Sequence, residues 1–432
     1  MRLLASMALT AVLAPAQDLL IRFATVHPVS GPDAENASVL VLDGRIVEIG
    51  VKIVPPKGKN IRIVDAKGLH VYPGMIDSGA QVGLAEIASV TESNDVGEIG
   101  DFNPQLRALI AINPESEHIP VTRANGITAA AVFPAQSGGR GGGGGGLIGG
   151  QISLIHLDGW TWEQMEIRRS AALQLRFPAV SGRSFGFSSE AVPGRESSYQ
   201  QARQNKDAEV KKLKNFFEEA RRYKAARDAK DPSFRTDVRL EAMLPVLDGK
   251  LPVVVMAVRE REIREAIGFA DEQRIRIILA GVRRPGRQLE EIAKRRIPVI
   301  LGTTLAAPLE EDDPYDAAYT LPAELHKAGV KFAFGSFGVQ FARNLPYEAA
   351  MGVAFGLPAA EGLKSVTLNA AGIWGLDAEY GSLEKGKVAN LVVADGDLLE
   401  ARTQVKMMFI KGAPVDLESK HTRLYKKYLA RP

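Results

Sequence analysis

Between residues 20 and 64 the chain contains four short stretches rich in alternating apolar and polar residues. The stretches are 20–23, 38–42, 45–50 and 61–64. Alternation with a period of two predicts strands that bury one face. Asp43 and Gly44, between the second and third stretches, are typical of a two-residue hairpin loop, because both residues of such a loop take positive φ. We therefore predict a small antiparallel unit in this part of the chain.

Mainly apolar runs follow, and they predict buried strands. The runs are 127–133, 173–177, 252–257, 276–280, 298–301 and 330–334. Stretches with helical periodicity separate several of them, most clearly at 260–273 and 288–295. Buried strands that take turns with helices are typical of a parallel sheet with helices on its faces. The pattern predicts an α/β fold, but the number of strands cannot be counted from it.

Two segments between these runs differ from the rest in composition. Residues 200–228 are strongly charged and carry Val210, Leu213, Phe217 and Ala220 at helical spacing, which predicts a helix with a solvated face over an apolar stripe. A partner-binding helix is the alternative. The glycine-rich run 137–151 lacks the Lys-Ser/Thr pair and the helix start of a phosphate-binding loop, so we predict a flexible loop.

Composition and charge narrow the class of protein. The chain has 432 residues, 24% of them charged, and a formal net charge of +3. Basic and acidic residues are interleaved, which predicts no nucleic-acid partner. The sequence contains no cysteine, which excludes thiolate metal sites and cysteine nucleophiles. After the N-terminal segment no apolar run is long enough to span a bilayer, so we predict no transmembrane segment in the mature chain.

The first sixteen residues have the layout of a secretory signal peptide. Arg2 supplies a positive charge, residues 3–13 are apolar, and Ala14-Pro15-Ala16 forms an A-x-A cleavage site ahead of Gln17. We predict cleavage after Ala16 and an exported protein, either periplasmic or secreted. The alternative is that this apolar segment is the first buried strand or helix of the fold.

Two motifs bracket nearly the whole mature chain. Residues 73–77 read Pro-Gly-Met-Ile-Asp, a turn that feeds a buried strand, and residues 381–387 read Gly-Ser-Leu-Glu-Lys-Gly-Lys. Both resemble segments of the metal-dependent amidohydrolases, in particular their imidazolonepropionase-like branch. The resemblance implies a (β/α)8 TIM-like barrel and a small β-sandwich domain built from both ends of the chain. The implied divisions are the sandwich at 17–70 plus 380–415, the barrel at 71–379 and a C-terminal tail at 416–432.

The same resemblance implies where the chemistry of the family would lie. Its hydrolases hold zinc or another divalent metal at the barrel mouth, with histidines at the ends of several strands and an aspartate that moves the proton. The positions that match this set are Gly79, Gln81, Met256, Ala280 and Phe337. None of them is an imidazole or a carboxylate, so we expect no catalytic metal and no cofactor. We expect structural roles for the six histidines, His27, His70, His118, His156, His326 and His421.

Arginines follow the ends of two of the predicted strands. Arg259 comes shortly after Met256, and Arg283 and Arg284 come shortly after Ala280. We hypothesise that these three arginines, helped by Arg140 and Arg183 from loops, form a basic rim for a small anionic ligand or the carboxylates of a partner. The alternative is that the arginines pair with Glu260, Glu262 and Glu290 at the surface.

Two functions remain open from the sequence. The first is an exported, non-catalytic binding or scaffold subunit, partnered with an active amidohydrolase relative. The second is an active metal-dependent amidohydrolase with a non-standard ligand set. By resemblance, its substrates would contain C–N bonds, as in non-peptide amides, lactams and dipeptides.

Overall fold

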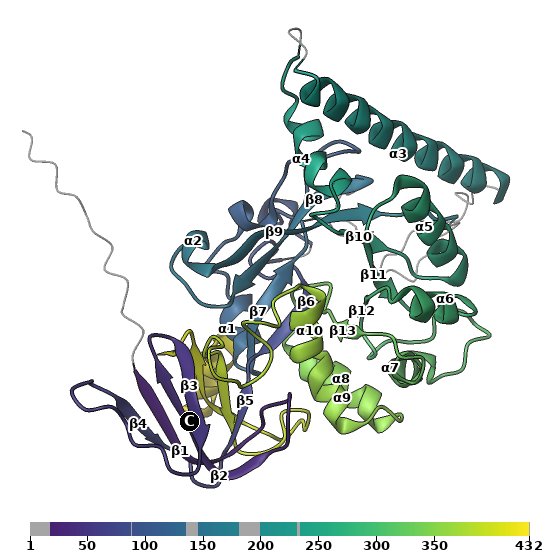
Figure 1. Cartoon of the computed structure of the whole chain (residues 1–432). Coiled ribbons are helices and arrows are strands. Elements are labelled where there is room, and N and C mark those ends of the chain that lie inside the picture. Colours follow the sequence, from purple (N-terminus) through teal and green to yellow (C-terminus); the bar gives the residue numbers. More distant parts are fainter. Residues whose placement is uncertain (1–17, 88, 135–145, 181–198, 231–233, 432) are drawn as a thin grey trace, which may run out of the picture.

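The computed structural model describes residues 18–431 except residue 88 and residues 135–145, 181–198 and 231–233 (Figure 1). The described chain forms two eight-stranded sheets with helices around the second of them. The predicted signal peptide, residues 137–145 of the predicted glycine-rich loop, Arg140 and Arg183 lie outside the described residues. The end of the predicted loop is wrong, because a strand begins at Ile148 and runs to His156.

The smaller sheet combines strands from both ends of the chain, as predicted. Its strands are β1 (Leu19–Val26), β2 (Ala34–Leu42), β3 (Arg45–Gly50), β4 (Arg62–Asp65), β5 (His70–Pro73), β14 (Leu391–Ala394), β15 (Val405–Ile410) and β16 (Ala413–Pro414). The order is β16-β15-β14-β5-β1-β2-β3, with β4 paired to β1. The predicted Asp43-Gly44 hairpin is confirmed, with φ values of 51° and 75°. The expectation of a purely antiparallel unit is wrong, because β4 and β5 run parallel to β1.

All eight strands belong to one sheet, which curls until its two ends meet. The backbone of residues 387–389 bonds to Gly44 and Ile46 at one end of the sheet and to Gly412 at the other. Apolar side chains from most of the strands pack together inside the curl. The two-layered unit implied by the resemblance therefore takes the form of a single rolled sheet.

The larger sheet is barrel-like. Its strands are β6 (Met75–Ala80), β7 (Ile127–Val132), β8 (Ile148–His156), β9 (Glu166–Arg176), β10 (Val253–Met256), β11 (Ile277–Val282), β12 (Val299–Leu301) and β13 (Phe332–Phe334). They are bonded in the order β13 to β6. The first and last strands approach each other where the Phe337 amide donates to the Gly79 carbonyl at 2.6 Å.

Strict β/α alternation is not found around this sheet. β8 runs antiparallel to both β7 and β9, whereas the other neighbouring strands are parallel. The connection from β8 to β9 carries only the four-residue α2 (Trp162–Met165). An α/β barrel-like fold is therefore present, with one reversed strand where the eightfold repeat would place a parallel one.

Helices pack mainly on the outside of the larger sheet, and the two predicted between buried strands are confirmed as α5 and α6 (Figure 1). The remaining long element, α3, is the predicted charged helix with Leu213, Phe217 and Ala220 buried. The helices are α1 (His118–Arg123), α3 (Tyr199–Asp228), α4 (Val238–Leu247), α5 (Glu260–Gln273), α6 (Gln288–Arg295), α7 (Ala317–Lys327), α8 (Leu345–Ala354), α9 (Ala359–Ser365), α10 (Leu368–Ile373) and α11 (Lys420–Leu429). Short 3₁₀ turns lie at Thr91–Ser93, Ala108–Ala111 and Ala342–Asn344.

The interior of the barrel is a packed core. Small side chains such as Ala131, Ala172 and Ala333 line it, and larger ones such as Phe133 and Trp374 fill it. A second and larger apolar cluster lies between the outer face of the sheet and the helices. A barrel lumen of this kind is core and not a channel, so the lumen itself has no room for a ligand.

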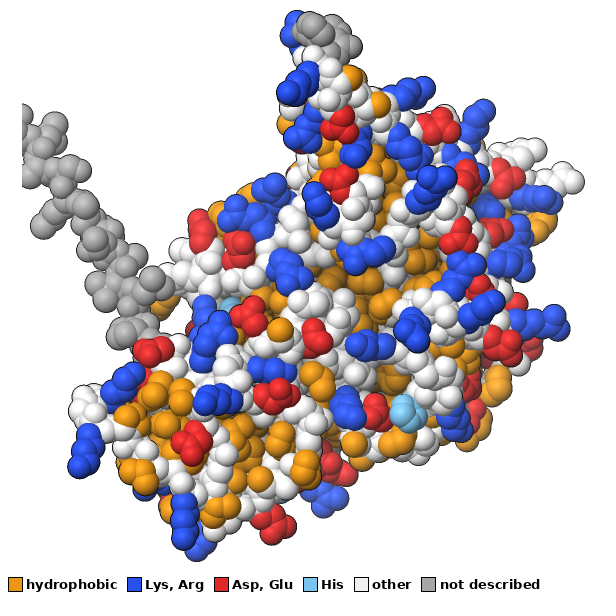
Figure 2. All heavy atoms as spheres, viewed as in Figure 1, with side chains coloured by type: hydrophobic (Ala, Val, Ile, Leu, Met, Phe, Trp, Pro, Cys, Tyr) orange, Lys and Arg blue, Asp and Glu red, His pale blue; other side chains and the backbone are white. Residues whose placement is uncertain are grey.

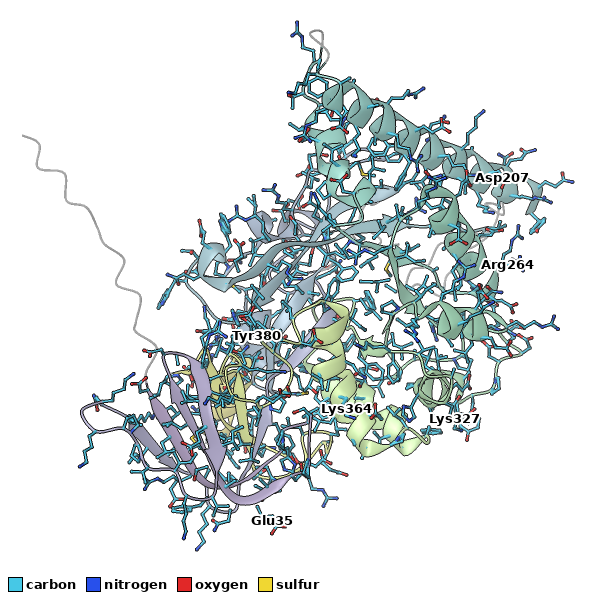
Figure 3. All side chains as sticks on the ribbon, viewed as in Figure 1. Glu35, Asp207, Arg264, Lys327, Lys364 and Tyr380 are labelled. Atoms are coloured by element: carbon cyan, nitrogen blue, oxygen red, sulfur yellow. The ribbon has the colours of Figure 1, made fainter. Side chains whose placement is uncertain are left out.

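The surface is mixed in charge. Lysine, arginine, aspartate and glutamate side chains are interspersed over the face shown in Figure 2. Labelled charged residues, among them Asp207 and Arg264, project outward from their helices, whereas Tyr380 lies between the small sheet and the barrel (Figure 3). Across the residues that the structure describes, every helix is too short or too polar to cross a bilayer.

Candidate functional site: the barrel mouth

The five positions at which the resemblance implies a metal site lie at the carboxyl ends of the parallel strands, and the structure brings several of them into contact. A Cβ on Gly79 would lie 2.9 Å from Phe337 Cε1, so the phenyl ring occupies the space that a side chain at position 79 would need. Met256, Ala280 and Phe337 belong to one apolar cluster. Gln81 is buried, with 4% of its surface exposed.

Phe337 has an unusual backbone. Its φ of 47° lies in the left-handed region, which costs a side-chain-bearing residue on the order of 1 kcal/mol. Its ring packs edge-on against Phe133, with centroids 5.4 Å apart, and approaches Gly302. This packing holds the strained residue with its ring over Gly79.

The residues at this mouth do not fit a divalent metal. Glycine, alanine and phenylalanine side chains offer no donor atom. A glutamine amide and a methionine thioether bind a divalent metal poorly unless imidazole or carboxylate ligands bind it as well. All six histidines of the sequence are described, and none belongs to these strand ends. Among the described residues, no group of three or more histidine, aspartate or glutamate side chains could hold a metal ion.

Asp77 is a buried carboxyl group that the sequence marks only as part of a motif. Its Oδ1 accepts from the amides of Gly79 and Ser336, both at 3.0 Å, while its fully buried Oδ2 has no partner among the described residues. Burial raises its pKa to about 7, against the lowering effect of these hydrogen bonds. The side chain joins β6 to the segment after β13 and so closes the barrel beside the apolar mouth.

Glu348 on α8 is a second buried carboxylate near the same mouth. It accepts hydrogen bonds from the hydroxyl of Thr303, the amide and hydroxyl of Thr304 and the amide of Leu305. These donors occupy both of its oxygens. Glu348 therefore anchors the loop after β12 and is poorly placed for proton transfer or metal binding.

The structure places the three predicted rim arginines side by side. The backbone of Arg259 bridges to that of Arg284, and the charge of Arg259 adds to the burial that lowers the pKa of Arg283. Their partners come mainly from the loop after β12 and differ from the acids predicted. Arg259 Nε contacts Glu310 at 2.8 Å, and Arg284 Nε contacts Asp313 at 3.1 Å. Of the three acids predicted as partners, Glu262 is found, 3.5 Å from Arg259 Nη1.

Arg283 also reaches this loop, because its Nη2 donates to the carbonyl of Ala307 at 2.5 Å. We call residues 307–313 the acidic loop. Its carboxylates form ion pairs with Arg259 and Arg284, two of the arginines that we predicted to bind a ligand. An anion at this rim must therefore compete with the loop.

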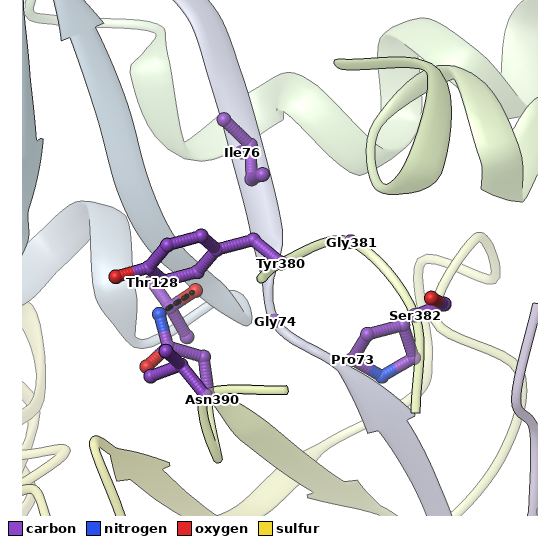
Figure 4. Close-up of a pocket in the computed structure, with 9 residues that line it drawn as sticks. Pro73, Gly74, Ile76, Thr128, Tyr380, Gly381, Ser382 and Asn390 are labelled. Carbon is purple, nitrogen blue, oxygen red and sulfur yellow. Dashed lines mark hydrogen bonds between the residues drawn. The ribbon is translucent and has the colours of Figure 1, made fainter. Parts of the chain in front are cut away.

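A polar cluster lies at the opposite end of the barrel, against the small sheet (Figure 4). The side chains of Thr128, Tyr380 and Asn390 face a small cavity there, and Gly74 is required because a Cβ would lie 2.1 Å from Thr128 Oγ1. Buried His156 contacts Tyr380 Oη and Asn390 Nδ2, each at 3.4 Å. Burial lowers the pKa of His156 to about 3, so the imidazole is neutral. The cluster joins the two sheets.

A serine and a lysine also meet at this junction. Lys387 Nζ donates to Ser382 Oγ at 2.5 Å, and both residues are buried. Lys387 Nζ also lies 3.6 Å from Glu384 Oε1. Glu384 Oε1 also accepts from Ser382 Oγ at 2.9 Å, so the three side chains bond to one another and support the junction.

Comparison with known proteins gives matches along most of the chain. The family model of the amidohydrolase family matches residues 318–415. The amidohydrolase tasK of Hapsidospora irregularis is 23% identical over 447 residues, which cover 94% of this chain and 44% of that protein. The chain thus spans less than half the length of that curated relative.

Solved structures resemble the fold over nearly its whole length. An amidohydrolase from Thermotoga maritima has a TM-score of 0.76 and 25% identity, with 92% of this chain and 99% of that chain covered. An adenosine deaminase from Xanthomonas campestris with bound zinc has a TM-score of 0.52 and 18% identity, with 95% and 97% covered. A prolidase complexed with N-methylphosphonate-L-proline has a TM-score of 0.55 and 16% identity, with 93% and 100% covered.

Proposed function

The chain belongs to the amidohydrolase superfamily, and from that premise we propose that it is a non-catalytic member that acts as a binding or scaffold subunit. The observation that carries the proposal is the contact between Gly79 and Phe337. These are two positions at which the family would place a metal-binding histidine and the proton-shuttling aspartate. A phenyl ring now fills the space between them.

The rest of the mouth supports the same conclusion. Hydrolysis by the family's mechanism needs a metal-activated water and a carboxylate that moves its proton. The two buried carboxyl groups described near the mouth, Asp77 and Glu348, are tied into the barrel wall by hydrogen bonds from backbone amides and threonine hydroxyls. The barrel wall is retained, while the chemical groups of the family's reaction are replaced.

We further propose that the basic rim provides the binding function. Arg259 and Arg284 stand at the mouth with partly exposed side chains, 33% and 43%, and the acidic loop is their present partner. A small anion or the carboxylates of an active amidohydrolase relative would replace the loop at these guanidinium groups. Export of the chain, to the periplasm or beyond, is part of the proposal and is supported by the signal-peptide layout of residues 1–16.

The proposal is tested by the metal content and activity of the purified mature chain. The protein is loaded separately with zinc, manganese and iron(II), dialysed, and assayed for bound metal and for hydrolysis of amides, lactams and dipeptides. We expect substoichiometric metal and no turnover. Stoichiometric metal that is lost in Met256→Leu or Gln81→Leu, with hydrolysis lost alongside it, would establish the active hydrolase with a non-standard ligand set instead.

A further inference from the structure

We propose that α11 binds the surface of an anionic phospholipid membrane and so holds the protein at a bilayer without crossing it. α11 spans Lys420–Leu429, reads Lys-His-Thr-Arg-Leu-Tyr-Lys-Lys-Tyr-Leu, and has no buried residue. It carries four lysine and arginine side chains and no acidic one. Neither the barrel mouth nor the proposed function uses this helix.

The helix divides cleanly into two faces. At roughly 100° per residue, Leu424, Tyr425, Tyr428 and Leu429 fall within an arc of roughly 140°. Lys420, Arg423, Lys426 and Lys427 fall within roughly 120° on the other side. An apolar face with aromatic residues beside a lysine-rich face is the arrangement of helices that lie in a membrane interface.

The apolar face is open to solvent. Tyr425 and Leu429 are 68% and 69% exposed, Tyr428 is 50% exposed and Leu424 is 37% exposed. A ten-residue helix with such exposure is marginal in water, because short helices depend on packing of their apolar face. The exposed face therefore points to an apolar surface that covers it.

Contacts at one end explain how the helix forms before it meets that surface. Ser419 caps it, accepting from the Thr422 amide while the Thr422 hydroxyl accepts from the Ser419 amide. Arg423 pairs with Glu117 and Arg343 contacts His421, which fixes the first turns against the body of the protein. Leu429 lies beyond these contacts, in the last turn.

Charge identifies the occupant of this surface. Lys420 and Lys427 have no acidic partner among the described residues, and Arg431 lies 4.3 Å over the Tyr428 ring. Lysines beside an apolar face extend along it and place their ammonium groups at lipid phosphates. Anionic phospholipids can contact both faces of the helix at once. Their phosphates pair with the cations, and their acyl chains cover Tyr425, Tyr428 and Leu429.

The test is co-sedimentation of the full mature chain with vesicles. One set contains phosphatidylglycerol in phosphatidylcholine, and the other contains phosphatidylcholine alone. We expect binding to the anionic vesicles that weakens with salt, weakens by roughly 30-fold in Lys420→Gln with Lys427→Gln, and is lost in Tyr425→Ser with Leu429→Ser. All four side chains are exposed, so these variants keep the fold, as circular dichroism would check.

Matched substitutions elsewhere serve as controls. Lys52→Gln with Lys57→Gln removes two exposed lysines of the small sheet region, and Val54→Ser with Ile63→Ser removes two exposed apolar side chains there, 85% and 55% exposed. Both control pairs should bind vesicles like the parent. Absence of sedimentation, equal binding to both vesicle types, or a dimer that Tyr425→Ser with Leu429→Ser dissociates would each overturn the proposal.

Discussion

Position 337 can hold a phenyl ring because position 79 has no side chain. A Cβ added to Gly79 would lie 2.9 Å from Phe337 Cε1, which is shorter than any ordinary carbon contact, and the Phe133 ring packed against Phe337 limits how far the ring can move. The two residues therefore depend on each other. A change at either one has consequences for the other that can be measured.

Gly79→Ala should lower the free energy of unfolding by about 1–3 kcal/mol, because overpacking forces the ring away from its site. Gly302→Ala is the control, since its Cβ would lie at an ordinary 3.8 Å from the same ring. In a Phe337→Ala background the cost of Gly79→Ala should largely disappear, as expected for residues in contact. Urea unfolding of these variants beside the parent measures this, and a Gly79→Ala protein as stable as the parent contradicts the packing described.

Asp77 should give stability a negative slope with pH. Its pKa is raised from 3.8 to about 7, so between these values the folded chain holds a proton that the unfolded chain has released. Stability therefore falls as pH rises from about 4 to about 7, by at most about 4 kcal/mol at roughly 1.4 kcal/mol per unit. Asp77→Asn, which keeps an oxygen acceptor for both amides, should flatten this slope. An unchanged pH profile would show that Asp77 does not titrate in this window.

His156 should act in the opposite direction. Its pKa is lowered from 6.5 to about 3, so between these pH values His156 is protonated in the unfolded chain and neutral in the folded chain. Stability should fall as pH drops from about 6.5 towards 3, and His156→Gln should remove that part of the acid sensitivity. Comparing the urea midpoints of parent and variant at pH 7 and pH 4 separates this effect from that of Asp77. Equal losses in both proteins on acidification would contradict it.

At the scale of elements, hydrophobic pattern located most strands and helices but not their directions. The runs that became β10 to β13 are recognisable because both faces of each strand are buried, and α5 and α6 because apolar residues recur at helical spacing. The antiparallel direction of β8 and the parallel pairing of β1 with β4 leave no mark on the sequence, because the period of two is the same in both cases.

The acidic partners of the rim arginines could not be predicted from the sequence for a related reason. Proximity along the chain favours Glu260, Glu262 and Glu290, whereas Glu310 and Asp313 come from a loop that follows a different strand. Contacts of this kind depend on the strand order, which only the folded chain supplies. The burial of Asp77 is equally invisible, since an aspartate after a turn is usually solvated.

Removing carboxylates from the acidic loop should make the rim arginines available to an anion. In Glu310→Gln with Asp312→Asn the arginines lose two carboxylate partners, and inorganic phosphate should then raise the melting temperature more than it does in the parent. The substitutions alone should change stability by less than about 1 kcal/mol, as is usual for exposed ion pairs. Asp271→Asn with Glu272→Gln, on α5, removes a matched pair of carboxylates away from the rim. An identical phosphate response in all three proteins contradicts a competing loop.

At the scale of the whole molecule, the barrel wall resembles that of the superfamily, whereas the side chains at the barrel mouth differ from those that the resemblance implies. The wall keeps its strand order, its packed lumen and the closure from β6 to the segment after β13. The mouth presents carbon and amide groups at the positions where the resemblance implies metal ligands. Under the proposed function, the stability of the fold does not depend on metal-binding groups at the mouth.

Titration with zinc tests this separation most directly, using the parent chain beside a restored variant with Gly79→His, Gln81→His, Met256→His, Ala280→His and Phe337→Asp. The wall positions these residues at neighbouring strand ends, so we predict stoichiometric zinc binding by the restored variant and none at this mouth in the parent. Stoichiometric binding by the parent that Phe337→Asp or Met256→Leu alters would contradict the account.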